Sequence, residues 1–179
     1  SVAAPTASLH FDENLFSRIE SQGHEMAFTT LHVGAGTFMP VKVQDILQHT
    51  MHSESYMLPE TTFKKIQKAQ TENRRIICVG TTALRSTESY FRLPEAEQRS
   101  QLGKWLKTSL YLHPQSTEDS ITLKSANALI TNFHQPGSTL LMLVSALISL
   151  KECKRVCEHA LEADYRFLSY GDACLFKLQ

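Results

Sequence analysis

Two short apolar runs, each closed by polar turn residues and followed by a helical pattern, most constrain how this chain folds. The first run is Arg75–Gly80, which leads directly to Thr81 and Thr82, and the second is Ala128–Thr131. Runs of this length and composition are typical of strands that are buried on both faces. We therefore predict that both are buried strands of one sheet.

The other apolar segments are separated by Gly and Pro and indicate further strands and helices. Strands are expected at Ala27–Val33, Met51–Leu58 and Ser109–His113, and as a pair turning at Gly171–Asp172. Helices are expected at Leu15–Ser21, from Pro59 to Asn73, after Thr81, at Thr139–Ile148 and at Lys151–Glu162. This alternation predicts the α/β class, with a layered, mixed and partly parallel sheet flanked by helices, in one domain over residues 1–179 without an internal linker.

The charge balance excludes a strongly basic nucleic-acid-binding surface over the whole chain. Lys plus Arg and Asp plus Glu number 18 each, so any RNA contact must come from a local patch. The basic residues from Lys64 to Arg75 are interpreted as a solvated helix face. The longest apolar stretch, Leu140–Ile148, is far shorter than the ~20 residues of a membrane span, so we expect a cytoplasmic protein without a membrane segment.

Four cysteines are too few and too scattered for a disulfide framework. Cys153 and Cys157 are one helical turn apart but lack a second pair of ligands, so we expect reduced thiols and no metal site.

The chain opens on Ser1 without an initiating Met, and we expect it to be a piece of a longer chain.

Two polar groups accompany the first predicted strands. Gly34 and Gly36 follow His32, and because no helix follows them, a turn that brings the backbone close to a substrate is favoured over a nucleotide-binding loop. A purely structural turn is the alternative. His52 and Glu54 would share one face of a strand, either as an acid–base pair or as an ordinary surface pair.

A third group lies at the start of the helix after Gly80. Thr81 and Thr82 are expected to cap this helix, whose free amides would hold a carboxylate. Arg85 and Glu88 would lie on the same side, and an ordinary cap with an exposed ion pair is the alternative.

The last two groups follow later strands. Thr131–Ser138 places polar side chains between a buried strand and an apolar helix, where α/β proteins bind ligands. Tyr165–Asp172 places charged and aromatic side chains around a turn, and a hydrophilic hairpin is its alternative.

Taken in order, six blocks resemble one family, the S-adenosylmethionine:tRNA ribosyltransferase-isomerases of queuosine biosynthesis. The blocks are Ala4–Ala7 with Leu9–Phe11, Leu31–Phe38, His52–Glu54, Val79–Thr82, Thr131–His134 and Ser169–Ala173. The resemblance runs to about Phe176 and implies that this chain is the C-terminal half of such an enzyme. The β-barrel domain of the family and the first part of its α/β domain would be missing.

The resemblance also implies a reaction. The family transfers the ribosyl moiety of S-adenosylmethionine to 7-aminomethyl-7-deazaguanine at the tRNA wobble position and rearranges it to epoxyqueuosine, releasing adenine and methionine. S-adenosylmethionine is then a consumed substrate, and no cofactor or metal is implied. The full-length enzyme is expected to be a monomer, whereas this chain alone is expected to be inactive and prone to self-association.

Mapped onto this chain, the reaction suggests a role for each polar group. His134 or His52 would be the base, Asp172 or Glu54 would assist the departing adenine, and Arg85 or Arg166 would hold a carboxylate or phosphate. Tyr170 and Phe133 would stack on adenine or face the sulfonium. The other substrate-binding candidates are His32, Gly34, Gly36, Thr81, Thr82 and Asn132, and we expect His32, His52, Thr81, Asn132, His134 and Asp172 to line one cleft.

The chain departs from the family in three places. His113–Ser116 stands where members have Pro-Gly-Tyr, Ser125–Asn127 lacks their Asp, and Ala146–Ser149 replaces Ala-Phe-Ala-Gly. Two other functions stay open. A non-catalytic RNA-binding module would bind tRNA without releasing adenine, and a methyltransferase is disfavoured because no helix follows the glycine turn.

Overall fold

The computed structural model describes residues 1, 4–34 and 46–178. Its helices are η1 (Thr6–His10), α1 (Glu13–Ser21), η3 (Ile46–Gln48), α2 (Glu60–Thr71), α3 (Thr81–Phe91), α4 (Glu95–Gln101), α5 (Thr139–Ile148) and α6 (Leu150–Glu162). Its strands are β1 (Thr30–His32), β2 (Glu54–Met57), β3 (Ile77–Val79), β4 (Leu106–Thr108), β5 (Ala128–Asn132) and β6 (Ala173–Lys177).

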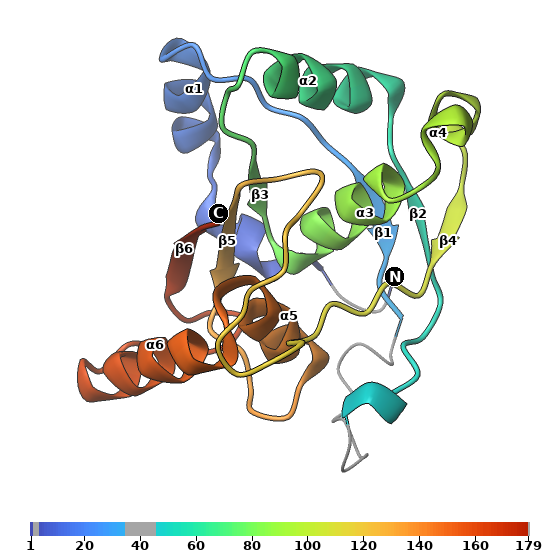
Figure 1. The fold of residues 1–179 in the computed structure, drawn as a ribbon. Helices are drawn as coiled ribbons and strands as arrows, with labels where there is room; N and C mark the ends of the chain where they lie inside the picture. The colour runs from blue at the N-terminus through green and yellow to red at the C-terminus, as the bar shows by residue number, and fades with distance from the viewer. Residues whose placement is uncertain (2–3, 35–45, 179) are drawn as a thin grey trace.

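These strands form two three-stranded sheets (Figure 1). The first is antiparallel, in the order β1-β2-β4, and the second has the order β3-β5-β6. Strands β3 and β5 are parallel neighbours, and β6 pairs antiparallel with β5. The expected α/β class with a partly parallel sheet is confirmed, as is the expectation that the two apolar runs supply strands of one sheet.

The two runs are buried to different degrees. Strand β5 lies between two partners and is buried almost throughout, whereas Ile77 of β3 exposes 47% of its surface. The reason is position, because β3 is the outer strand on its side of the described sheet. The prediction that the run Arg75–Gly80 is a fully buried strand was therefore wrong, although Cys78 at its centre is buried.

Two other strand predictions were wrong. The strand expected at Ser109–His113 lies earlier, at β4, because its register is set by pairing with β2, where Tyr56 lies opposite Leu106. The residues around Gly171 form turns closed by backbone hydrogen bonds, with Asp172 N donating to Arg166 O at 2.7 Å. Strand β6 therefore pairs with the central β5 and not with a hairpin partner.

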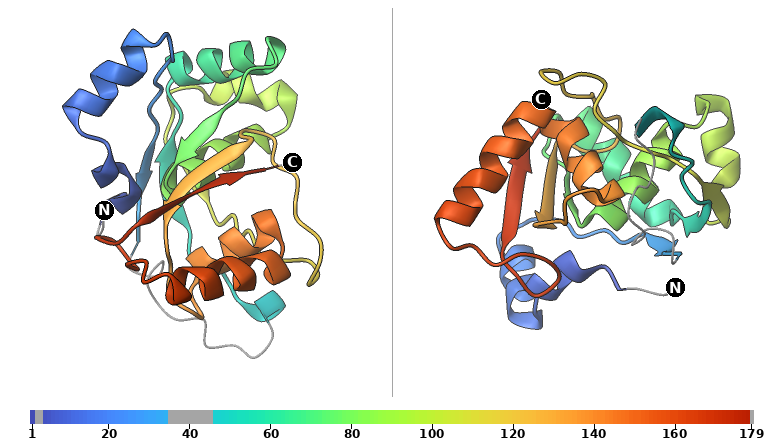
Figure 2. Two further views of the ribbon diagram at one scale, coloured as in Figure 1. Left: turned by 90° about the vertical axis from the view of Figure 1, so that its left-hand side faces the viewer. Right: turned by 90° about the horizontal axis from the view of Figure 1, so that it is seen from below.

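Helix α3 contacts both sheets and joins the two apolar cores of the described chain (Figure 1). Its Leu84 packs with Cys78 and Leu129 in one core, to which α5 and α6 also contribute. Its Tyr90 packs in the other core, with Phe63 of α2. Figure 2 shows α5 and α6 side by side against the second sheet.

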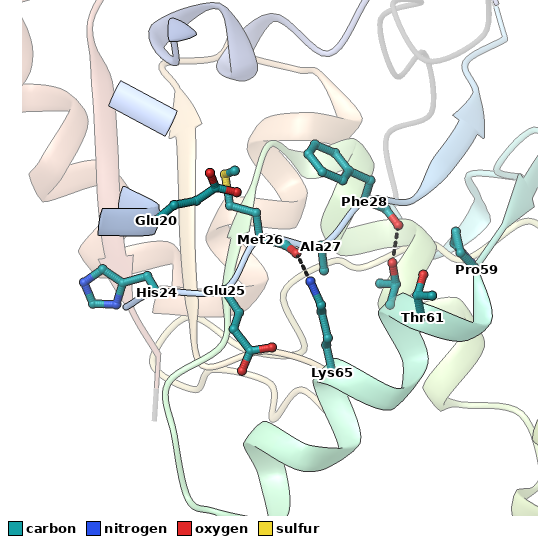
Figure 3. A pocket seen from close by; sticks show the side chains of 10 residues that line it. Glu20, His24, Glu25, Met26, Ala27, Phe28, Pro59, Thr61 and Lys65 are labelled. Atoms are coloured by element: carbon teal, nitrogen blue, oxygen red, sulfur yellow. Dashed lines mark hydrogen bonds between the residues drawn. The ribbon is translucent and has the colours of Figure 1, made fainter. Parts of the chain in front are cut away.

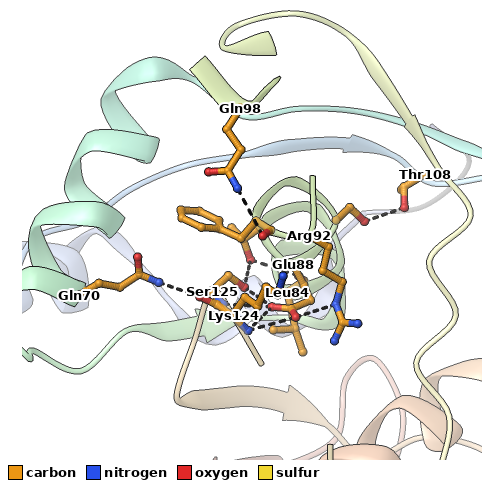
Figure 4. A network of polar contacts seen from close by, with 11 residues as sticks. Gln70, Leu84, Glu88, Arg92, Gln98, Thr108, Lys124 and Ser125 are labelled. Atoms are coloured by element: carbon orange, nitrogen blue, oxygen red, sulfur yellow. Dashed lines mark hydrogen bonds and ion pairs between the residues drawn. The ribbon is translucent and has the colours of Figure 1, made fainter. Parts of the chain in front are cut away.

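Five consecutive residues of α3, from Arg85 to Ser89, are polar and buried. Each has a partner, because an unpaired polar group in the interior is costly. Glu88 is fully buried and accepts hydrogen bonds from Ser125 Oγ at 2.8 Å, from the backbone amides of Lys124 and Ser125, and from Arg92 (Figure 4). This carboxylate therefore attaches the 124–125 loop to α3.

Helix starts follow local chemistry. Ser138 caps α5 by accepting a hydrogen bond from Leu141 N at 3.1 Å, as expected from Pro136–Ser138. The capping role expected of Thr81 and Thr82 was wrong, because Gly80 is the N-cap of α3 and both threonines lie inside the helix. Gly80 has a φ of +89°, which only glycine adopts readily.

No helix in the described ranges is long and apolar enough to cross a membrane.

We predict that Glu88→Ala lowers the free energy of unfolding by about 3 kcal/mol or more, because it leaves buried amides without acceptors. The control is Glu118→Ala, which removes an exposed ion pair with Lys151 and should cost at most about 1 kcal/mol. Urea denaturation of both variants measures the difference. Equal losses of stability would contradict the structural role given to Glu88.

Candidate functional site

A buried ion pair connects the first sheet to α3. Arg85 Nη1 donates to Glu54 Oε2, and Gly34 N, just after β1, donates to Glu54 Oε1 at 2.7 Å. Glu54 is 3% exposed and Arg85 is 4% exposed. Two charges buried this deeply persist only when hydrogen bonds compensate for their lost hydration, and the glycine amide supplies one.

Part of the Arg85 guanidinium is unpaired among the described residues. Its Nε and Nη2 are buried and have no hydrogen-bond acceptor in the part of the chain that the structure describes. These two nitrogens form one edge of the planar group, and that edge matches the two oxygens of a carboxylate or phosphate. A buried donor without an acceptor costs about 1–3 kcal/mol, so the edge favours binding of an oxygen-bearing group.

A second polar cluster lies where β5 ends and β6 begins. The side chain of Asn132 contacts His10 of η1, with 3.0 Å between Nδ2 and Nε2. When the amide nitrogen donates, His10 Nε2 accepts, and the imidazole proton lies on Nδ1. Asp172 precedes Ala173, which pairs with Asn132 across the sheet.

Asp172 is held by the turn before it. It accepts hydrogen bonds from the Arg166 guanidinium at 3.0 Å and from Arg166 N at 2.8 Å. The Arg166 side chain, and to a smaller extent His10, lower the pKa of Asp172 below its ordinary value. Asp172 is therefore an anion at neutral pH, which does not fit the proton-donating role expected for it.

His134 lies in different surroundings. Its Nε2 is 2.9 Å from Thr131 Oγ1, and because Thr131 and Asn132 are consecutive in a strand, their side chains point to opposite faces. Burial lowers the pKa of His134 to about 4, so its imidazole is neutral at pH 7. His134 also lines a small hollow between β5, β6, α5 and α6 that includes Asn132 and Phe133.

Three thiols line the same hollow, from Cys153 and Cys157 on α6 and Cys174 on β6. Burial raises the pKa of both Cys157 and Cys174 to about 11, so these thiols are protonated and poor nucleophiles at neutral pH. All four cysteines are free, as expected. In the described ranges, no three His, Cys, Asp or Glu side chains are arranged to hold a metal ion.

Another hollow lies between α1 and α2 (Figure 3). Lys65 donates to Met26 O at 2.7 Å there, and Thr62 donates to Phe28 O, so the segment before β1 is attached to α2. None of the residues predicted for the site lines this hollow.

The remaining predicted residues are dispersed. His32 and His52 are exposed, and among the described residues neither is hydrogen-bonded to the two polar clusters. His52 precedes β2 and does not share the buried face with Glu54. Thr81 is buried, and the Thr82 carbonyl accepts a hydrogen bond from Ser86. Gly36 lies outside the described residues.

The two aromatic candidates differ in environment. Phe133 is buried against Phe167, with ring centroids 4.7 Å apart, and against Tyr165. Tyr170 exposes 89% of its surface. Of these two candidates, Tyr170 is therefore the one with an exposed aromatic face.

Sequence reasoning did not select His10, although this residue lies within a block that carries the resemblance. The available signal was a histidine in a short polar segment, and its contact with Asn132 spans 122 positions. Arg85 was selected, but its partner was expected to lie one turn along the helix.

We expect the buried, neutral His134 to make folding pH-dependent. Its pKa is about 4 when folded and about 6.5 when unfolded, so the stability it confers is complete above pH ~6.5 and is lost as the pH falls toward 4. His134→Gln should lose less stability than the unmodified chain between pH 7 and pH 5, measured by urea midpoints. The control is His24→Gln, which changes an exposed histidine. If the stability of His134→Gln depends on pH as strongly as that of the unmodified chain, this assignment is contradicted.

Comparison with known proteins gives one consistent result. Residues 1–176 match the family model described as queuosine biosynthesis protein. An S-adenosylmethionine:tRNA ribosyltransferase-isomerase from Paraburkholderia xenovorans is 46% identical over 174 residues, which are 97% of this chain and 48% of the relative. A protein of the same name from Psychrobacter arcticus is 42% identical over 179 residues, 100% of this chain and 43% of its own.

A solved structure agrees with these sequence matches. The crystal structure of an S-adenosylmethionine tRNA ribosyltransferase from Thermotoga maritima superposes with a TM-score of 0.75 at 35% identity, covering 95% of this chain and 51% of that one. This chain therefore spans about half the length of the relatives it matches. Because the family model covers nearly all of it, the chain belongs to the queuosine biosynthesis protein family.

Proposed function

We propose that this chain is part of an enzyme that transfers the ribosyl moiety of S-adenosylmethionine to 7-aminomethyl-7-deazaguanine at the tRNA wobble position. The enzyme rearranges that moiety to give epoxyqueuosine and releases adenine and methionine. The observation that carries the proposal is the 46% identity, over 97% of this chain, to a relative named for this transfer and isomerisation. S-adenosylmethionine is then a consumed substrate and no cofactor takes part, and the enzyme works in the cytoplasm.

Arg85 is the group best suited to hold the methionine carboxylate of S-adenosylmethionine. Its unpaired edge presents two parallel donors, and the other side of the guanidinium is held by Glu54. Glu54 itself accepts from both Arg85 and Gly34. We assign Glu54 to orienting this clamp, because its two carboxylate oxygens already act as acceptors.

His134 and His10 are the two candidates for proton transfer that the described structure favours. His134 is neutral at pH 7, as a base must be, although a pKa of about 4 makes it a weak one. His10 contacts Asn132 and lies under the electrostatic influence of Asp172. An imidazole held in place by a side-chain amide can take part in proton transfer.

The other candidate function is a non-catalytic tRNA-binding module that keeps the fold. Three substitutions relative to the family, at His113–Ser116, Ser125–Asn127 and Ala146–Ser149, favour it. The structure gives Ser125 a role of its own, because it is fully buried and donates to Glu88. That segment therefore supports the fold, and its divergence does not require loss of activity.

The test is adenine release from labelled S-adenosylmethionine by a hybrid in which this chain replaces the matching residues of the Paraburkholderia xenovorans relative. We expect release with tRNA that carries 7-aminomethyl-7-deazaguanine and none with tRNA that carries guanine there, which lacks the nucleophilic amine. This chain alone should release no adenine. Binding of tRNA by the hybrid without adenine release would establish the non-catalytic module instead.

In the same hybrid, Arg85→Lys should raise the KM for S-adenosylmethionine about tenfold or more, because lysine keeps the charge but cannot present two parallel donors. The matched control is Arg155→Lys, because Arg155 is an exposed arginine on α6 that pairs with Glu152. An unchanged KM in Arg85→Lys would remove Arg85 from the carboxylate clamp.

A further inference from the structure

The outward face of the first sheet carries an exposed pair of neighbouring rings that are tilted toward each other. His32 of β1 and Trp105, which directly precedes β4, have ring centroids 4.7 Å apart with planes inclined by 37°. Trp105 exposes 54% of its surface, and His32 is exposed too. An exposed tryptophan beside a second ring offers a flat aromatic surface on which a planar group can stack.

The strand register explains how the two rings meet. His32 lies opposite Ser55 of β2, and Ser55 lies opposite Lys107 of β4. Side chains two residues apart in a strand share a face, so Trp105 is on the same face as Lys107. The small Ser55 between them leaves room for both rings to lie across β2.

The two faces of this sheet differ in chemistry. The inward residues are buried, namely Leu31, Glu54, Tyr56 and Thr108. The outward positions are Thr30, His32, Ser55, Met57, Trp105 and Lys107, and none of them is acidic. Exposed Lys104 lies next to Trp105, so the face combines a flat aromatic surface with positive charge.

We propose that this face binds single-stranded RNA by stacking one base on Trp105 beside His32, with Lys104 and Lys107 next to the phosphates. Aromatic side chains on an open sheet bind unpaired bases in this way, and each stacked base contributes about 1–3 kcal/mol. The choice of RNA as occupant rests on the proposed function. The face is the reverse of the strand side that holds Glu54 and Arg85, so it is a binding surface distinct from the carboxylate clamp.

Trp105 is the single tryptophan of the chain, which makes its fluorescence a direct reporter. We expect an unstructured RNA of about ten nucleotides to quench this fluorescence at low salt when added to the 179-residue chain. Anisotropy of a labelled RNA should show about tenfold weaker binding by Trp105→Ala and nearly full binding by Trp105→Phe. Circular dichroism checks that both variants are folded.

Charge variants test the phosphate contact. Lys107→Ala should reduce the slope of log affinity against log salt by about one, whereas Lys154→Ala, the same change at an exposed position of α6, should not.

Equal RNA affinity in Trp105→Ala would overturn the proposal, as would absence of quenching by RNA. Equal quenching by adenosine or S-adenosylmethionine alone would assign the face to a small molecule instead. Adenine release by the hybrid is measured separately, so failure of this proposal and failure of the proposed function are distinguishable.

Discussion

The fold depends on one helix, α3, which carries three buried polar side chains that are paired with three different parts of the chain. Arg85 is paired with Glu54 of β2, Glu88 with the 124–125 loop, and Ser89 with Thr108 of β4, through hydroxyl oxygens 2.6 Å apart. Apolar contacts alone would let a helix slide between two sheets. Polar pairs of this kind fix its position, because each displacement would leave buried donors and acceptors unsatisfied.

The same constraint connects stability with the candidate site. Arg85 uses one side of its guanidinium to bind Glu54 and leaves the other edge without an acceptor in the described structure. A residue that served only the fold would be expected to satisfy both sides. The free energy cost of these unpaired donors is removed when a ligand oxygen accepts their hydrogen bonds. This arrangement is typical of a preorganised binding group.

Local patterns predicted the elements that local chemistry determines. The helix after Ser138 and the strand at Ala128–Thr131 follow from a capping residue and a short apolar run, and both were confirmed. The position of β4 was wrong, because its register depends on strand β2, about 50 positions earlier along the chain. Likewise, Arg85 was expected to lie beside Glu88, one turn away, but pairs with Glu54, 31 positions away.

Contacts of that range cannot be read from spacing, which is also why His10 and Trp105 were not selected. The resemblance located the blocks that carry Glu54 and Asn132 but could not say which side chains meet. A double-mutant cycle with Glu54→Gln and Arg85→Met tests the central claim, that this buried pair connects α3 to the first sheet. We predict a coupling free energy of about 2 kcal/mol or more from urea denaturation, and additive effects, within about 0.5 kcal/mol, would contradict the account.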